Sequence, residues 1–154
     1  MAFAPLPPAL VEAGTALLRA ADDVGLHPQA AAWVYDHGFD EWRYVLVSPL
    51  VDTIGRRRVY QLLVKAFRKL DLADGFAVVD VSLESPQSPL FRGLYRALPV
   101  RGLQDGQFIF ERCIINGLMF DGVIYRWLDT PPLRQIRRIE KEFVRKAGKL
   151  ARAV

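Results

Sequence analysis

The stretch QFIFERCIINGLMFDGVIYRW, residues 107–127, is the most β-like part of this chain of 154 residues. β-branched and aromatic residues dominate it, and strands favour both types. Asn116-Gly117 stands between two such runs and is a strong signal for a two-residue hairpin turn. Asp121-Gly122 is a competing turn five residues later. We favour Asn116-Gly117 as the turn and Asp121-Gly122 as a bulge.

A second β-hairpin is predicted nearer the N-terminus, over residues 30–48. Aromatic side chains stand in both halves of this stretch: Trp33, Tyr35, Trp42 and Tyr44. A polar loop around Gly38 separates the halves, as is typical of a hairpin. If the register is symmetric about Gly38-Phe39, aromatic side chains of the two strands pair across one face. We favour core packing over a ligand-stacking surface for them.

Helical spacing of apolar residues predicts helices around the two hairpins. We expect them over residues 9–24, 53–70, 89–98 and 131–154, with one further strand over residues 76–83. The order α-ββ-α-β-α-ββ-α indicates an α+β fold. Its sheet has about five strands, mixed or antiparallel, and three to four helices cover at least one face. No repeat or linker divides the chain, so residues 1–154 are expected to form a single globular domain.

The periodicity also predicts which side chains form the core. Those expected to be largely buried are Trp33, Tyr44, Phe67, Phe108, Phe110, Ile139 and Phe143. They come from both hairpins and from two helices, so the helices are expected to pack on the sheet.

The net charge of +4 is concentrated in two segments. Residues 55–70 carry six basic side chains and no acid, and residues 130–154 carry eight basic and two acidic ones. Phosphate backbones attract such rows, although a row of charges on a helix is more often a solvated face. The candidate nucleic-acid-binding residues are Arg57, Arg58, Lys65, Lys69, Arg134, Arg138, Lys141, Arg145 and Lys149.

The sequence contains no recognisable catalytic or metal-binding motif. One cysteine and two histidines form no zinc-ligand pattern, and no phosphate-binding glycine loop occurs. We therefore expect no metal and no cofactor. Three carboxylates, Asp80, Glu84 and Glu111, lie on or beside predicted strands. If their strands are neighbours, Asp80 and Glu111 could converge as an acid–base pair or a magnesium site. The alternative is that they face solvent or pair with Arg112 and Arg126.

The remaining features favour a binding domain over an enzyme. Cys113 is the single cysteine, which fits a reducing compartment, and no run of about 18 apolar residues predicts a membrane helix, so we expect a cytoplasmic protein. The interpretation that we favour is a small non-catalytic interaction domain that acts through a protein partner or by self-association as a homo-oligomer. The alternative is weak, sequence-tolerant nucleic-acid binding through the basic helix faces. A small carboxylate-dependent enzyme comes third.

Overall fold

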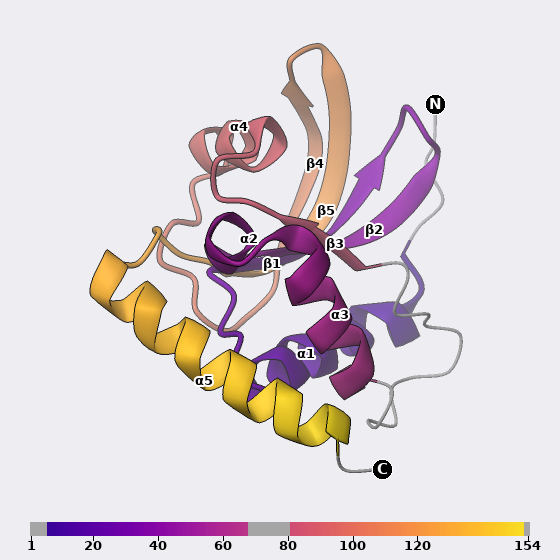
Figure 1. Ribbon diagram of the computed structural model, residues 1–154. Coiled ribbons are helices and arrows are strands. Elements are labelled where there is room, and N and C mark those ends of the chain that lie inside the picture. Colours follow the sequence, from indigo (N-terminus) through magenta and orange to yellow (C-terminus); the bar gives the residue numbers. More distant parts are fainter. Residues whose placement is uncertain (1–5, 68–80, 153–154) are drawn as a thin grey trace.

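The computed structural model describes residues 6–67 and 81–152, and Figure 1 shows their arrangement. One five-stranded mixed sheet and five helices make up this part of the chain, which confirms the predicted α+β fold and element order. The helix beyond the predicted number is the four-residue α2. The elements are α1 (Pro8–Asp23), β1 (Ala30–Asp36), β2 (Glu41–Val47), α2 (Leu50–Thr53), α3 (Arg56–Phe67), β3 (Val81–Glu84), α4 (Pro89–Ala97), β4 (Phe108–Ile115), β5 (Leu118–Trp127) and α5 (Leu133–Arg152).

The strand order in the sheet is β3-β2-β1-β5-β4. The neighbours β1–β2, β1–β5 and β4–β5 are antiparallel, and β2–β3 is parallel. The two hairpins therefore sit side by side through β1 and β5, and β3 and β4 form the two edges. Of the two predicted alternatives, mixed and antiparallel, the sheet is mixed, because β3 runs beside β2 in the same direction.

The β1–β2 hairpin has the predicted register. Asp36 lies opposite Glu41, so the hairpin is symmetric about Gly38-Phe39. The aromatic side chains pair across one face as expected. The ring centroids are 5.1 Å apart for Trp33–Tyr44 and 5.2 Å apart for Tyr35–Trp42.

The β4–β5 hairpin turns at Asn116-Gly117, as predicted. Ile115 lies opposite Leu118, and Asn116 and Gly117 have φ angles of 50° and 79°, which two-residue hairpin turns require. The predicted bulge is present, but its extra residue belongs to the other strand. Glu111 and Arg112 of β4 lie together opposite Asp121.

One contact explains why the extra residue is on β4. The backbone N–H of Arg112, whose φ is 53°, donates to the Asp121 carboxylate over 2.9 Å. Gly122 is needed for a different reason, because a Cβ there would collide with the carbonyl oxygen of Trp33 and with the ring of Phe110. Close approach of neighbouring strands, and not a bulge in β5, therefore accounts for the glycine.

Helices cover both faces of the sheet (Figure 1). α1, α3 and α5 pack on one face, and α4 packs on the other. Three buried rings hold α1 on the sheet by donating to its carbonyl oxygens. The donors are Trp33 Nε1 to Leu10, Tyr44 Oη to Gly14 and Tyr125 Oη to Val11, over 2.7, 2.6 and 2.6 Å respectively.

Six of the seven predicted core side chains are buried: Trp33, Tyr44, Phe67, Phe110, Ile139 and Phe143. The seventh, Phe108, is partly buried and packs against the core on the α4 side of the sheet. The predicted ends of α3 and of the strand at 76–83 lie partly outside the described residues. None of the described helices combines the length and apolar character that crossing a membrane requires.

Candidate functional site

The predicted basic side chains are all exposed wherever the structure describes them. Those on α3 are Arg57, Arg58 and Lys65, and those on α5 are Arg134, Arg138, Lys141, Arg145 and Lys149. Lys69 lies outside the described residues. The apolar faces of α3 and α5 pack into the same core, which leaves the basic side chains directed outward. The structure thus does not gather the candidates at one point, but two of them lie in a groove.

This groove runs between the start of α5, the loop before β1 and the end of β5. It has a volume of about 910 Å³, and its lining includes Arg134, Arg138, Gln29, Arg126 and Ile139. Its volume is of the order found for small-ligand sites, but it is more open and more polar than most of them. One wall of the groove is the loop between α1 and β1. Gln29, at the end of this loop, holds the β5–α5 connection by donating to Thr130 Oγ1 over 3.1 Å.

Arg126 forms the polar floor of the groove. Its guanidinium donates to both carboxylate oxygens of Asp22 over 2.8 and 2.9 Å. It also reaches the carbonyl oxygens of Pro28 and Gln104 and the carboxylate of Asp105, over 3.2, 2.9 and 3.4 Å. Burial disfavours the charged form and is the largest single influence, but the hydrogen bonds and negative charges of Asp22 and Asp105 together outweigh it and raise the pKa of Arg126. Its donors are therefore occupied within the fold.

The other acids that line the groove also have cations of their own. Asp129 accepts from Tyr95 and, over 3.0 Å, from Arg101, and these bonds lower the pKa of its carboxyl group. Glu142 pairs with Lys146 over 2.7 Å, which lowers its pKa likewise. Within residues 6–67 and 81–152, by contrast, Arg134 and Arg138 form no ion pair. The groove therefore presents two unpaired arginines, and because Arg126 is shared by Asp22 and Asp105, the formal excess is one positive charge.

A second unusual surface lies on the edge strand β4. Ile109 and Ile114 are 69% and 64% exposed, and Leu118 and Met119 of β5 are exposed beside them. The hairpin that carries these side chains projects from the top of the molecule in Figure 1. Ile109 lies opposite Val123 and Ile114 opposite Met119. Because Val123 and Met119 are four residues apart in one strand, the two isoleucines share one face of the sheet.

The predicted carboxylate site is not assembled among the described residues. Glu84 is on β3 and Glu111 is on β4, and these strands are the opposite edges of the sheet, about 19 Å apart at the usual strand spacing. Glu84 instead lies 3.7 Å from Arg56. Asp80 lies outside the described residues. Glu84 and Glu111 therefore do not converge, and the predicted pairing of Asp80 with Glu111 stays a prediction.

The other reactive side chains of the described part of the chain form no metal site and no catalytic group. There, no three His, Cys, Asp or Glu side chains lie close enough together to hold a metal ion. Cys113 is half-buried, and burial raises the pKa of its thiol. His37 contacts Asp121, the carboxylate that also holds the β4 bulge. These groups do not form a nucleophile–base pair.

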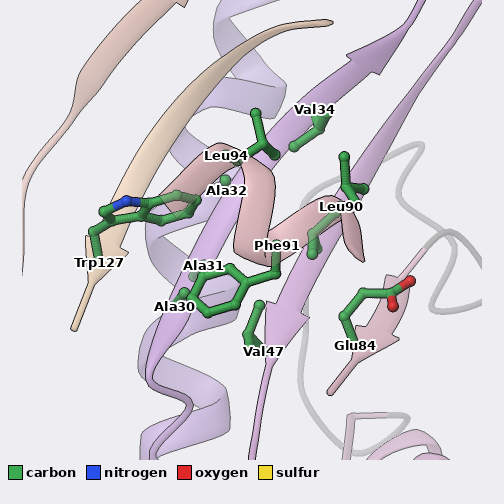
Figure 2. A pocket seen from close by; sticks show the side chains of 11 residues that line it. Ala30, Ala31, Ala32, Val34, Val47, Glu84, Leu90, Phe91, Leu94 and Trp127 are labelled. Carbon is green, nitrogen blue, oxygen red and sulfur yellow. The ribbon is translucent and has the colours of Figure 1, made fainter. Parts of the chain in front are cut away.

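An enclosed hollow lies between α4 and the sheet, and Figure 2 shows the side chains around it. Its walls are mostly apolar, with Ala30, Phe91, Leu94 and Trp127 among them, and its volume is about 10 Å³. This is about the space of one water molecule. The hollow therefore has no room for a ligand larger than a water molecule.

Sequence reasoning missed Arg126 and Asp22, the pair that builds the groove floor. They are 104 residues apart in the chain. The available signal was an arginine directly after the apolar residues 123–125 of a strand, since a buried charge needs a partner. No known protein family, curated protein or solved structure matches the chain.

Proposed function

We propose that this protein is a non-catalytic interaction domain that self-associates through the β4 edge of its sheet. The observation that carries the proposal is the pair of exposed isoleucines, Ile109 and Ile114, on an edge strand that no described strand covers. A long apolar edge strand is a template for pairing with another chain. We place this activity in the cytoplasm, in keeping with a single unpaired cysteine.

The sequence of β4 is complementary to itself in an antiparallel arrangement. In FIFERCII, a two-fold axis between Glu111 and Arg112 places each Glu111 opposite Arg112 of the second copy. The same axis places Ile109 opposite Ile114 of the second copy. Opposite charges and apolar pairs facing each other across strands both stabilise a sheet. A two-fold dimer of this kind uses up its own edges and closes.

The β4 bulge supports a second copy over an unrelated strand. A regular strand paired along β4 would lose its register at the extra residue between Phe110 and Cys113. A second copy carries the same extra residue at the same place. Glu111 and Arg112 of one copy then lie opposite Arg112 and Glu111 of the other, so the register continues on both sides of the bulge. The bulge and its charges thus oppose unspecific pairing while permitting pairing with an identical strand.

The opposite edge of the sheet provides the contrast. β3 has four residues, and the Arg56 guanidinium donates to the carbonyl oxygen of Leu83 over 2.9 Å. A short strand with a charged side chain laid over it is a protected edge. Association is therefore expected at β4 and not at β3.

Sedimentation equilibrium of four proteins tests this proposal. The wild type is expected to dimerise, and E111R or R112E alone is expected to weaken the dimer by placing like charges opposite each other. The double variant E111R/R112E restores opposite charges and should recover the dimer. Each exposed pair contributes little, so we expect an effect of about 0.5–1 kcal/mol per pair, present twice by symmetry.

Arg19→Glu on α1 is the matched control, since Arg19 is exposed and lies on another element. It should leave the dimer unchanged. A wild type that stays monomeric at high concentration contradicts the proposal. So does a double variant that is weaker than both single variants.

Nucleic-acid binding through the basic helix faces is the second candidate function. The observation that favours it is the pair of unneutralised arginines, Arg134 and Arg138, in the groove. An enzymatic function has no comparable support, because the described carboxylates do not converge.

A further inference from the structure

We infer that the groove beside α5 binds a phosphate group, with Arg134 and Arg138 as its cationic ligands. This site is independent of the β4 edge and goes beyond the proposed self-association. The phosphate could belong to a free phosphate ester or to the backbone of a nucleic acid, and the experiment below separates these sources.

The balance of charge in the groove favours an anion. Four acids line it, and three cations of the fold are paired with them: Arg126 with both Asp22 and Asp105, Arg101 with Asp129, and Lys146 with Glu142. The two arginines are not matched within the described residues. The net charge around a bound ligand is therefore positive once the paired cations are counted, although the charges of the lining side chains alone sum to a negative value.

The spacing of the two arginines favours a phosphate over a carboxylate. They are four residues apart on α5, so they stand on one face, about 6 Å apart along the helix axis. Each guanidinium offers a planar fork of donors. A phosphate has several acceptor oxygens and up to two negative charges, so it can accept from both forks at once, whereas a carboxylate fits one fork.

A fixed frame stands behind the two arginines. Arg126 and Asp22 join the end of β5 to the end of α1, and Gln29 holds the connection to α5 through Thr130. The start of α5 is therefore tied to the sheet next to the two arginines. Further along the groove, apolar surface suits the organic part of a phosphate ester, and it comes from Ile139, Pro28 and Leu128.

Two probes test the inference: pyrophosphate in isothermal titration calorimetry, and a labelled oligothymidylate of about 20 nucleotides in fluorescence anisotropy, both at about 50 mM salt. The wild type should bind at least one of them. R134A/R138A should bind it about tenfold more weakly or worse, because the charge-assisted hydrogen bonds to the phosphate are gone. R57A/R58A removes the same charge from α3 and should bind pyrophosphate like the wild type.

The conservative variant R134K/R138K keeps the test decisive if the alanine variant fails to fold. It keeps both charges but lacks the planar forks, so its affinity should lie between those of the wild type and the alanine variant. Thermal unfolding of all variants identifies any that fail to fold. If the alanine variant unfolds, weaker binding by a folded lysine variant still supports the site, and unchanged binding by that lysine variant overturns it.

A third variant, R145A/K149A, distinguishes the two sources of phosphate. If a nucleic-acid strand follows the row along α5, this variant should weaken oligothymidylate binding and lower the salt slope by about 0.7 for each phosphate that is no longer neutralised. If a free phosphate ester is the ligand, the variant should bind pyrophosphate like the wild type and the oligomer should not bind. A wild type that binds neither probe overturns the inference, and so does an R134A/R138A variant that binds like the wild type.

Discussion

The two hairpins of this protein contain similar residues but differ in how far their apolar side chains are buried. In β1–β2, Trp33 and Tyr44 lie under α1 and each donates a hydrogen bond to its backbone. In β4–β5, Ile109 and Ile114 face solvent. The first hairpin is central in the sheet and the second ends at its edge. The difference shows that position in the sheet, and not the β propensity of the residues, decides which apolar side chains this fold buries.

The two hairpins are also expected to serve different purposes. An apolar side chain covered by a helix contributes to the stability of the monomer, whereas one left exposed on an edge contributes to association. The first hairpin is therefore expected to respond to mutation by unfolding. The second is expected to respond by dissociating while remaining folded.

The largest expected effect separates the hairpins directly. Trp33→Ala should lower the free energy of unfolding by about 3–5 kcal/mol, because it removes a buried ring and its bond to Leu10. Ile109→Ala should lower it by less than about 1 kcal/mol in the monomer, because most of the side chain is already exposed. Urea titration at low protein concentration measures both. Equal losses of stability would mean that β4 is as well covered as β1.

A second effect concerns pH and belongs to the first hairpin and its neighbour β5. Burial raises the pKa values of Tyr44 and Tyr125 above that of tyrosine in the unfolded chain. Their contribution to stability is complete below about pH 10 and is lost as the pH rises further, because unfolding then releases their protons. Two such groups should make the free energy of unfolding fall by about 2.7 kcal/mol per pH unit there.

The variant Y44F/Y125F tests the origin of this alkaline decline. It should flatten the decline above pH 10 in urea titrations at each pH, although its stability near neutrality will be lower because two buried hydrogen bonds are gone. An equally steep decline in this variant would assign the effect to other groups.

A smaller effect is expected at the β4 bulge. Asp121→Ala removes the acceptor that holds the N–H of Arg112, and we expect it to lower the free energy of unfolding by about 1–3 kcal/mol. It should also loosen β4 more than β2, which hydrogen exchange can resolve peptide by peptide. Equal loosening of both strands would show that Asp121 supports the sheet as a whole and not the bulge.

Local chemistry made much of this fold predictable. Asn116-Gly117 determined the second hairpin because few dipeptides accept the two positive φ angles of its turn. The bulge was assigned to the wrong strand because its position depends on where the Asp121 side chain finds a donor, which is a contact across strands. The exposure of Ile109 could not be predicted either, because the alternation of apolar and polar residues does not distinguish an edge strand from a central one.

The candidate sites were predictable only in part. The row on α5 followed from helical spacing, and Arg134 and Arg138 are in it. What singles them out is that the acids around them are paired elsewhere, through contacts such as Arg126 with Asp22 across 104 residues. Such long-range pairing leaves no periodic trace in the sequence.

The most direct test of self-association through β4 is hydrogen exchange of the wild type at low and high protein concentration. Amides of Phe108–Ile115 that point away from β5 should exchange quickly in dilute solution and become protected as the dimer forms, because an edge strand gains these hydrogen bonds only from a partner. The amides of β1 should be protected equally at both concentrations, since β1 is paired on both sides. Exchange in β4 that does not change with concentration would contradict the account.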